Sequence, residues 1–192
     1  MDDIAIQLQD SIETKKAVLS TNLGVIRKIA DVLVNAFKNN QRLYLIGNGG
    51  SAADAQHIAG ELVGRFKMNR RPLPAVALTT DTSVITALAN DFGYDTCFAR
   101  QIEALANPGD VILAFSTSGN SKGILSAVQI ARDRGAIAIG FTGKDGGLLK
   151  DASDICLKIP SDNTPRIQEC HITVGHILCS IVEKELFGSV TK

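Results

Sequence analysis

A glycine-rich run followed closely by an ionisable pair is the part of this sequence best suited to chemistry. The run Gly47–Ser51 stands between the apolar segment Leu43–Ile46 and a stretch beginning at Ala52, an order typical of a strand, a tight turn and a helix. Backbone N–H groups and the helix dipole at such a turn face an anion. His57 and Glu61 lie one turn apart on that helix. The unit therefore predicts a small phosphorylated substrate and proton transfer.

A second anion-binding candidate is the hydroxyl-rich loop Ser116–Ser121, which precedes the helical pattern Lys122–Arg134. Serine and threonine are also favoured helix N-caps, so capping is the alternative interpretation. One cap needs one such residue, whereas this loop offers four hydroxyl groups in six positions, which favours phosphate binding. Neither this loop nor the glycine-rich run has the spacing of a nucleotide P-loop or a dinucleotide-binding turn, so no nucleotide cofactor is expected.

Further candidates lie in the last predicted helix, from about Thr164 to Phe187. Gln168 and His176 are about two turns apart on broadly one side of it, and apolar neighbours predict partial burial of His176. A histidine on an apolar helix is more often a hydrogen-bonded core residue, and a His–Glu pair one turn apart is more often an exposed surface pair. However, all three histidines of the chain, His171 included, lie in these two helices. That distribution favours a shared site.

The elements that position these residues alternate between strands and helices. Short unbroken apolar runs predict five buried strands, at Leu43–Ile46, Ala75–Leu78, Val111–Phe115, Ala136–Phe141 and Ile155–Ile159. Helical patterns separate them, at Ala52–Phe66, Ser83–Asn90, Cys97–Leu105, Lys122–Arg134 and a short segment near Leu148. The alternation predicts an α/β fold, a doubly wound five-stranded parallel sheet flanked by helices.

Ligands bind at the carboxyl ends of the strands in such sheets. Polar loops follow four of the predicted strands, at Gly47–Ser51, Thr79–Thr82, Ser116–Ser121 and Thr142–Gly147. We therefore expect these loops to lie along one edge of the sheet.

Two helical patterns precede the first strand, from about Ile4 to Phe37. Apolar residues recur there at three- and four-residue spacing, at Leu19, Leu23, Ile26, Ile29, Ala30, Leu33 and Phe37. Helices this early cannot complete a βαβ unit, so they are expected to cover a sheet face or a partner subunit. Since no linker or repeat is visible, residues 1–192 are treated as a single domain, with N-terminal helices over 1–40 and the α/β core and C-terminal helix over 41–192.

Composition excludes several classes of protein. Twenty basic residues balance twenty acidic ones, and no run of like charges resembles a nucleic-acid arm or an anchor for anionic membranes. No segment approaches the length of about 20 apolar residues that spans a bilayer, and the acidic start lacks a signal core. The four cysteines show no Cys-x-x-Cys spacing, so buried reduced thiols are expected. These features predict a soluble cytoplasmic protein without nucleic-acid or membrane partners.

Taken in order, the motifs resemble the phosphoheptose isomerase family, the sedoheptulose 7-phosphate isomerases built on the sugar-isomerase (SIS) fold. The matching segments span nearly the whole chain: Gly47–His57, Glu61–Phe66, Ala77–Ser83, Asn90–Tyr94, Ser116–Ser121 and Arg166–Glu169. The resemblance implies isomerisation of sedoheptulose 7-phosphate to D-glycero-D-manno-heptose 7-phosphate through an enediol or enediolate. This is the first step of bacterial ADP-heptose synthesis, which supplies surface heptose such as that of the lipopolysaccharide core. A homotetramer with active sites at subunit interfaces is also implied, with the N-terminal helices used in oligomer packing.

The resemblance further implies a set of site residues. Glu61 is the expected general base, and His176 is the expected acid or base for hydroxyl and carbonyl protons. Substrate contacts correspond to Asn48, Gly49, Gly50, Glu61, Asn90, Asp91, Ser116, Thr117, Ser118, Ser121 and Gln168, with Ser51 beside them. Zinc ligands, for one ion per subunit, correspond to His57, Glu61, Gln168 and His176. Glu61 and His176 cannot act freely while both are fully bound to zinc, so a metal that polarises the carbonyl and a structural or inhibitory metal both stay open.

One departure and one alternative function accompany the resemblance. Pro165 stands where some family members carry an acidic residue, so a carboxylate contact there is absent or is supplied by Asp162. The alternative is a non-catalytic SIS adaptor that binds the bacterial replication initiator protein. Such adaptors lack the acid/base residues at the positions of Glu61 and His176, which this chain keeps.

Overall fold

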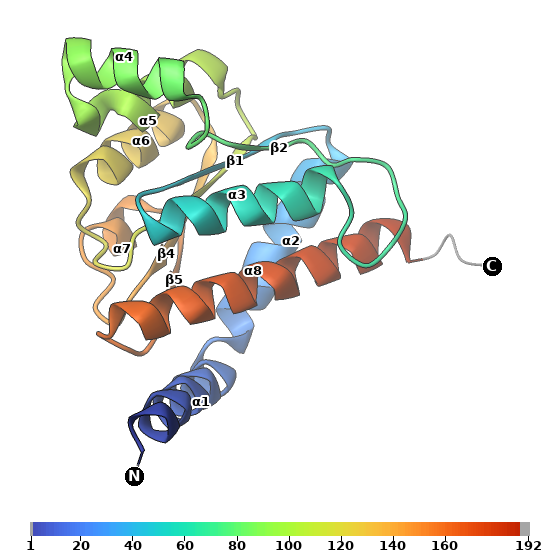
Figure 1. The fold of residues 1–192 in the computed structure, drawn as a ribbon. Helices are drawn as coiled ribbons and strands as arrows, with labels where there is room; N and C mark the ends of the chain where they lie inside the picture. The colour runs from blue at the N-terminus through green and yellow to red at the C-terminus, as the bar shows by residue number, and fades with distance from the viewer. Residues whose placement is uncertain (1, 189–192) are drawn as a thin grey trace.

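A five-stranded, all-parallel sheet forms the centre of the molecule (Figure 1). The computed structural model describes residues 2–188. The strands are β1 (Leu43–Gly47), β2 (Ala75–Ala77), β3 (Val111–Phe115), β4 (Ile137–Thr142) and β5 (Ile155–Lys158). They follow the order β2-β1-β3-β4-β5, and every neighbouring pair is parallel. The predicted doubly wound α/β fold is confirmed.

Helices cover both faces of this sheet. They are α1 (Asp3–Thr21), α2 (Leu23–Lys38), α3 (Gly50–Val63), α4 (Thr82–Phe92), α5 (Cys97–Leu105), α6 (Lys122–Asp133), α7 (Leu149–Ala152) and α8 (Thr164–Phe187), with a 3-10 turn, η1 (Tyr94–Thr96). Helices α2, α3 and α8 pack on one face, and α5, α6 and α7 on the other. Across the part of the chain that the structure describes, none of these helices is long and apolar enough to cross a membrane.

The sheet separates two apolar cores. In β1, Leu43 and Leu45 face the core under α2, α3 and α8, whereas Tyr44 and Ile46 face the opposite core. Helices cover both faces of β1, β3 and β4, which explains why these strands are apolar without alternation. The edge strand β2 differs, because Val76 is 44% exposed. The predicted burial of this strand is therefore correct for one face only.

The two N-terminal helices differ in what they cover. One apolar face of α2 is buried against the sheet, as the sequence predicts. The predicted apolar stripe also includes Leu19 and Leu23, but these side chains are 63% and 60% exposed. Polar bonds tie α1 to α8 instead, where the guanidinium of Arg166 donates to the carbonyl of Gln7 at 2.6 Å. Much of the apolar surface of α1 thus remains uncovered within one chain.

Two glycines let α3 and α8 approach each other closely. A Cβ atom on Gly175 of α8 would lie 2.5 Å from Cδ1 of Ile58 on α3. A Cβ atom on Gly50, in the first turn of α3, would lie 2.7 Å from Nε2 of Gln168 on α8. Carbon atoms do not approach other heavy atoms so closely without a shift. Glycine at position 175 therefore allows the close approach of the two helices, whereas a side chain at position 50 would displace the end of Gln168.

Relative to Gly60→Ala, substitution of Gly175 by alanine is expected to lower the free energy of unfolding by about 1–3 kcal/mol, the usual cost of an extra carbon in a packed core. Urea unfolding followed by circular dichroism measures this change. Gly60→Ala in α3 is the matched control, because a Cβ atom there meets nothing within 4 Å and alanine favours a helix by about 1 kcal/mol. Equal changes in the two variants would contradict a packing role for Gly175.

Candidate functional site

Of the four polar loops that the sequence predicts at one edge of the sheet, those after β1, β3 and β4 are joined by hydrogen bonds. The side-chain amide of Asn48, after β1, donates to the hydroxyl of Ser121, after β3, at 3.0 Å. The backbone N–H of Gly143, after β4, donates to the carbonyl of Thr117 at 2.9 Å. These bonds join the loops into one polar rim beside the N-termini of α3 and α6.

The turn between β1 and α3 depends on glycine. Gly49, the N-cap residue of α3, has φ +57° and ψ −123°, a left-handed conformation that favours glycine. A Cβ atom on Gly47 would lie 2.5 Å from the carbonyl oxygen of Ser51, so this position also excludes a side chain. The first turn of a helix carries N–H groups without helical partners. This turn can therefore face an anion without a charged side chain.

Helix capping does not account for the hydroxyl groups of the loop after β3. Ser121 is the N-cap residue of α6, but its side chain makes no capping hydrogen bond within the described residues. The hydroxyl of Ser118 accepts from the N–H of Asn120 at 3.2 Å, and Ser116 is buried. Thr117 and Ser118 line a cavity of about 220 Å³ between the loops. Capping does not account for Ser121, which supports the phosphate interpretation.

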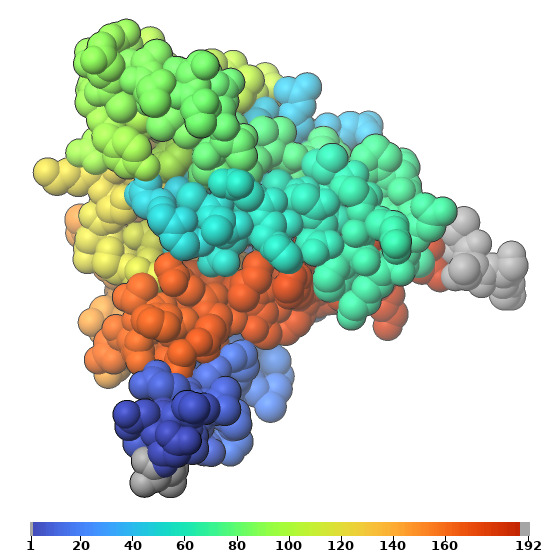
Figure 2. All heavy atoms as spheres, viewed as in Figure 1, coloured from blue at the N-terminus to red at the C-terminus, as the bar shows by residue number. Residues whose placement is uncertain are grey.

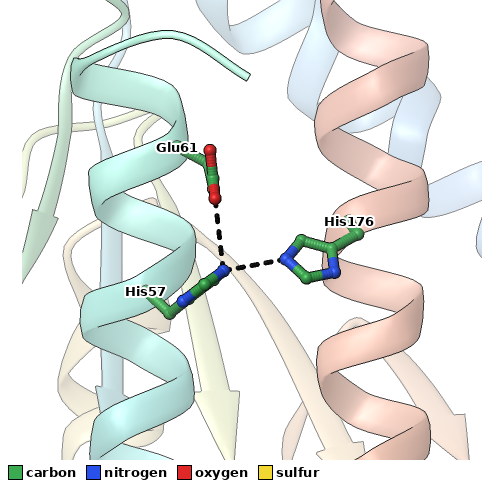
Figure 3. A group of neighbouring side chains, drawn as sticks. All are labelled: His57, Glu61 and His176. Atoms are coloured by element: carbon green, nitrogen blue, oxygen red, sulfur yellow. Dashed lines mark hydrogen bonds and ion pairs between the residues drawn. The ribbon is translucent and has the colours of Figure 1, made fainter. Parts of the chain in front are cut away.

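The second half of the site lies between α3 and α8, where His57, Glu61 and His176 converge (Figure 3). Nε2 of His57 lies 2.8 Å from Nε2 of His176 and 3.2 Å from Oε1 of Glu61. His176 is half-buried, as predicted, whereas His57 is exposed. Two ring nitrogens at hydrogen-bond distance cannot both carry a proton, because one must accept the bond that the other donates. The cluster is therefore suited to proton exchange or to metal binding.

The other predicted site residues lie at the start of α3, on α8 and at the end of α4. The carboxamide of Gln168 lies against Gly50, at the start of α3, about two turns before His57. Asn90 and Asp91 lie at the end of α4, where the amide of Asn90 donates to the carboxylate of Asp91 at 2.8 Å. Ser51 is buried within the first turn of α3. The contacts of these residues with substrate or metal stay predictions.

A buried ion pair lies at the end of the α3–α8 interface, beside the C-terminus of α3. It has no signal in the sequence patterns described above. The side chains of Arg70 and Glu183 are 1% and 2% exposed, with Nε 3.0 Å from Oε1. The Arg70 guanidinium also donates to the carbonyls of Glu61 at 2.8 Å and Leu62 at 2.7 Å. Helix α3 ends at Val63 with Gly64 as its C-cap residue, and the guanidinium binds the last carbonyls of the helix. The sequence-based prediction of a helix to residue 66 is wrong.

The carboxylate of Glu183 also holds the segment after α3. It accepts hydrogen bonds from the backbone N–H groups of residues 66–68 at 2.9, 2.8 and 3.1 Å. Burial raises the pKa of Glu183, but these donors and the charge of Arg70 outweigh burial and hold the pKa below its usual value. The ring of Phe66 stacks on the imidazole of His176, with centroids 5.4 Å apart and planes 12° apart. The ion pair thus positions a ring that packs on the site.

Asp54 places a further carboxyl group one turn before His57 on α3. Burial raises the pKa of Asp54 to about 6, although His57 acts to lower it. Its Oδ2 atom is buried and has no hydrogen-bond partner in residues 2–188. This carboxyl group therefore changes charge in a pH range close to neutral.

The third histidine does not join the cluster. His171 is 0% exposed, and its Nε2 donates to the carbonyl of Thr142 at 3.2 Å. The rings of Phe115 and Phe141 pack around it, with centroids at 5.8 and 5.5 Å. Burial lowers the pKa of His171 to about 4, although the bond to Thr142 acts to raise it. Only two of the three histidines therefore share a site.

Comparisons with known proteins agree on one family. A family model described as the SIS domain matches residues 8–143. The phosphoheptose isomerase of Geobacter metallireducens is 54% identical over 186 residues, which cover 97% of this chain and 98% of that protein. Solved structures of phosphoheptose isomerases from Francisella tularensis and Neisseria gonorrhoeae match with TM-scores of 0.93 and 0.88, each at 39% identity. These two matches cover 95% and 94% of this chain and 97% of each solved chain.

Replacing His171 by glutamine is expected to flatten the pH dependence of stability between pH 6.5 and 4. In the folded protein His171 stays neutral down to about pH 4, whereas its ordinary pKa is 6.5. The unfolded chain therefore binds more protons in this window. The neutral, buried His171 therefore contributes its full stabilisation above pH 6.5. This stabilisation is lost as the pH falls toward 4, which lowers the free energy of unfolding by up to about 3 kcal/mol. Glutamine does not titrate and keeps an N–H donor.

Urea unfolding of wild type and His171→Gln at pH 7, 5.5 and 4.5 measures this difference. His57→Gln is the matched control, since His57 is exposed and lies outside the core that surrounds His171. The same loss of stability on acidification in wild type and His171→Gln would show that His171 is not the responsible group.

Proposed function

This chain belongs to the phosphoheptose isomerase family of SIS-domain proteins, and we propose on that basis that it converts sedoheptulose 7-phosphate to D-glycero-D-manno-heptose 7-phosphate. The reaction is an aldose–ketose isomerisation, in which a proton moves between C1 and C2 through an enediol or enediolate. The observation that carries the proposal is the convergence of Glu61 and His57, on α3, with His176, on α8. The start of α3 lies beside the polar rim.

The separation of the two halves of the site fits a seven-carbon sugar phosphate. Seven residues of α3 separate His57 from Gly50, or about 10 Å at about 1.5 Å per residue. An extended seven-carbon chain with its phosphate ester spans about the same length, at about 1.2 Å per bond. The phosphate is therefore placed at the polar rim and C1–C2 at the histidine–glutamate cluster. Fixing both ends of the substrate orients the reacting carbons.

Glu61 is the proposed general base that moves the proton between C1 and C2. Its carboxylate is half-buried and is carried on a helix, so its position is well defined. His176 is the proposed acid or base that exchanges protons with the oxygen atoms on these carbons. Triosephosphate isomerase combines a glutamate and a histidine for similar proton transfer, an analogy that supports this assignment.

The remaining proposed contacts hold the rest of the substrate. Hydroxyl and backbone groups of the loops after β1 and β3 bind the phosphate and nearby sugar oxygens, from Asn48, Gly49, Gly50, Ser51, Ser116, Thr117, Ser118 and Ser121. Asn90 and Asp91 bind sugar hydroxyl groups, and Gln168 contacts the substrate from α8. The position of Asn48 and Ser121 on one rim supports this arrangement.

The same cluster fits one zinc ion per subunit, with His57, Glu61 and His176 as ligands. Gln168 is the proposed fourth ligand, and in this structure its carboxamide lies against Gly50. Two imidazole nitrogens and a carboxylate oxygen, all within 4.8 Å of one another, are a donor set that zinc accepts. When bound, zinc would polarise the oxygen atoms on C1 and C2. A fully coordinated Glu61 cannot accept a proton. For Glu61 to act as the base, its carboxylate would have to be free of the ion or only loosely held; otherwise a bound ion would be structural or inhibitory.

We also propose a homotetramer with active sites at subunit interfaces. Helix α1 exposes apolar side chains, with Ile4 and Leu8 at 68% and 61% exposure, and no residue of α4 is buried. An apolar groove of about 200 Å³ lies between α1, α2 and α8. Helices α1 and α4 lie at opposite ends of the face in Figure 2. Contact with other subunits would cover these surfaces.

The cellular role follows from the substrate. A charged sugar phosphate is retained inside the cell, so a cytoplasmic location is proposed. The product is an intermediate for ADP-heptose, which supplies surface heptose such as that of the bacterial lipopolysaccharide core. The replication-initiator adaptor is not favoured, because the chain keeps Glu61 and His176 and its relatives are named isomerases.

Proton NMR of sedoheptulose 7-phosphate incubated with the protein tests the reaction. Wild type is expected to produce aldoheptose 7-phosphate signals. Glu61→Gln is expected to lower turnover by about 10²–10⁴-fold, because an amide cannot accept the proton. Glu103→Gln, at an exposed position of α5, is the matched control and should keep the wild-type rate. No turnover by folded, zinc-supplemented wild type would overturn the isomerase function, and normal turnover by Glu61→Gln would remove Glu61 from the mechanism.

Zinc binding is tested by metal analysis and by competition with a chromophoric chelator. Wild type is expected to hold one zinc ion per chain, and His57→Ala should weaken binding by at least about tenfold, because one of the ligands is lost. His171→Gln is the control, since His171 lies outside the cluster. Equal affinity in wild type and His57→Ala would contradict this site. Full activity after verified zinc removal would exclude an essential metal.

A further inference from the structure

Tyr94 connects two parts of the site that are far apart in sequence. It is the first residue of η1 and follows Asn90 and Asp91 at the end of α4. Its hydroxyl donates to Oδ1 of Asn48, in the loop after β1, at 2.8 Å. Neither the reaction nor the zinc site proposed above uses this side chain.

The hydrogen bond from Tyr94 to Asn48 determines which atom of Asn48 faces Ser121. Oδ1 of Asn48 accepts from Tyr94, and Nδ2 of Asn48 donates to the hydroxyl oxygen of Ser121 at 3.0 Å. Ser121 is therefore an acceptor toward Asn48, which leaves its own O–H free to donate elsewhere. No capping bond uses that hydroxyl within the described residues. The chain of bonds thus presents a donor at the N-terminus of α6.

We propose that Tyr94 is a positioning residue that determines specificity for the phosphate group of the substrate. It holds the carboxamide of Asn48 in one orientation, so that the Ser121 hydroxyl donates to a phosphate oxygen. This inference rests on the proposed function only for the identity of the sugar. The recognition of a phosphate group can be tested without turnover.

The backbone around Tyr94 is fixed against α6, so its hydroxyl has a defined position. A Cβ atom on Gly123, in the first turn of α6, would lie 3.2 Å from the carbonyl oxygen of Asp95. The backbone N–H and the hydroxyl of Thr96 both bond to the carbonyl of Gly93, at 3.1 and 2.9 Å. Gly93 itself has φ +89°, which favours glycine. The turn that carries Tyr94 therefore packs directly on the helix whose N-terminus faces the anion.

The proposed role separates phosphorylated from unphosphorylated sugars. A hydrogen bond to an ionised oxygen is about twice as strong as one between neutral groups. An aligned Ser121 donor therefore contributes more to binding a phosphate than to binding a sugar hydroxyl. Without the Tyr94 hydroxyl, the Asn48 carboxamide can rotate and donate to other acceptors. Phosphate binding should weaken more than sugar binding.

Tyr94→Phe removes the hydroxyl and keeps the ring. We expect KM for sedoheptulose 7-phosphate to rise about 5- to 20-fold and kcat to stay within about twofold, because the reacting carbons lie at the other end of the site. The dissociation constant for inorganic phosphate, measured by calorimetry, should rise by a similar factor. Inhibition by unphosphorylated sedoheptulose should change by less than about twofold. Tyr44→Phe is the matched control, because its hydroxyl donates to the carbonyl of Leu105 in the core.

A double-mutant cycle tests whether Tyr94 acts through Ser121. If it does, Tyr94→Phe should add little to the loss of phosphate affinity in Ser121→Ala. Additive losses, unchanged phosphate affinity in Tyr94→Phe, or equal effects on phosphate and sedoheptulose would each overturn the proposal. Phosphate binding is measured without turnover, so failure of the isomerase function and failure of this inference give different results.

Discussion

The site depends on α3 and α8 being held at a short and fixed distance. Gly175 allows the two helices to touch at Ile58, as Gly50 does at Gln168. His57 and Glu61 project from one helix, and His176 projects from the other. The spacing of the two helices is therefore also the spacing of the functional groups. A shift that repacked the interface would change the distance between the ring nitrogens, which lie 2.8 Å apart.

The buried ion pair of Arg70 and Glu183 also holds the two helices in place, because its hydrogen bonds are directional as well as attractive. A buried ion pair often adds little net stability, because removing both charges from water is costly. Here the planar guanidinium bonds at once to the carboxylate of α8 and to the last carbonyls of α3. Apolar side chains in the same place could fill the volume but could not define the register of one helix against the other. The ion pair thus determines the register of α3 against α8 more than it adds to the stability of the fold.

The sequence predicts the features whose signals are local. The buried strands are recognised by short apolar runs, and the pair of His57 and Glu61 by its spacing of one turn. The end of α3 has a local signal, the C-cap residue Gly64, but the ion pair beside it is tertiary, because Arg70 and its partner Glu183 are 113 residues apart in sequence. The difference between His171 and His176 is also tertiary. Five residues turn the helix by about 140° beyond a full turn, so one faces the core and the other faces α3.

Helix α3 joins the two halves of the site and so relates substrate length to chemistry. Its start lies at the polar rim, where we propose that the phosphate binds, and its later turns carry His57 and Glu61. Because the helix is rigid, the distance from the anion to the proposed base is constant. If the phosphate binds at the rim, a sugar phosphate with one carbon fewer would leave C1 about 1.2 Å farther from the cluster of His57, Glu61 and His176. A misplacement of about 1 Å can cost about 10²-fold in rate, so the helix itself favours a chain of one length.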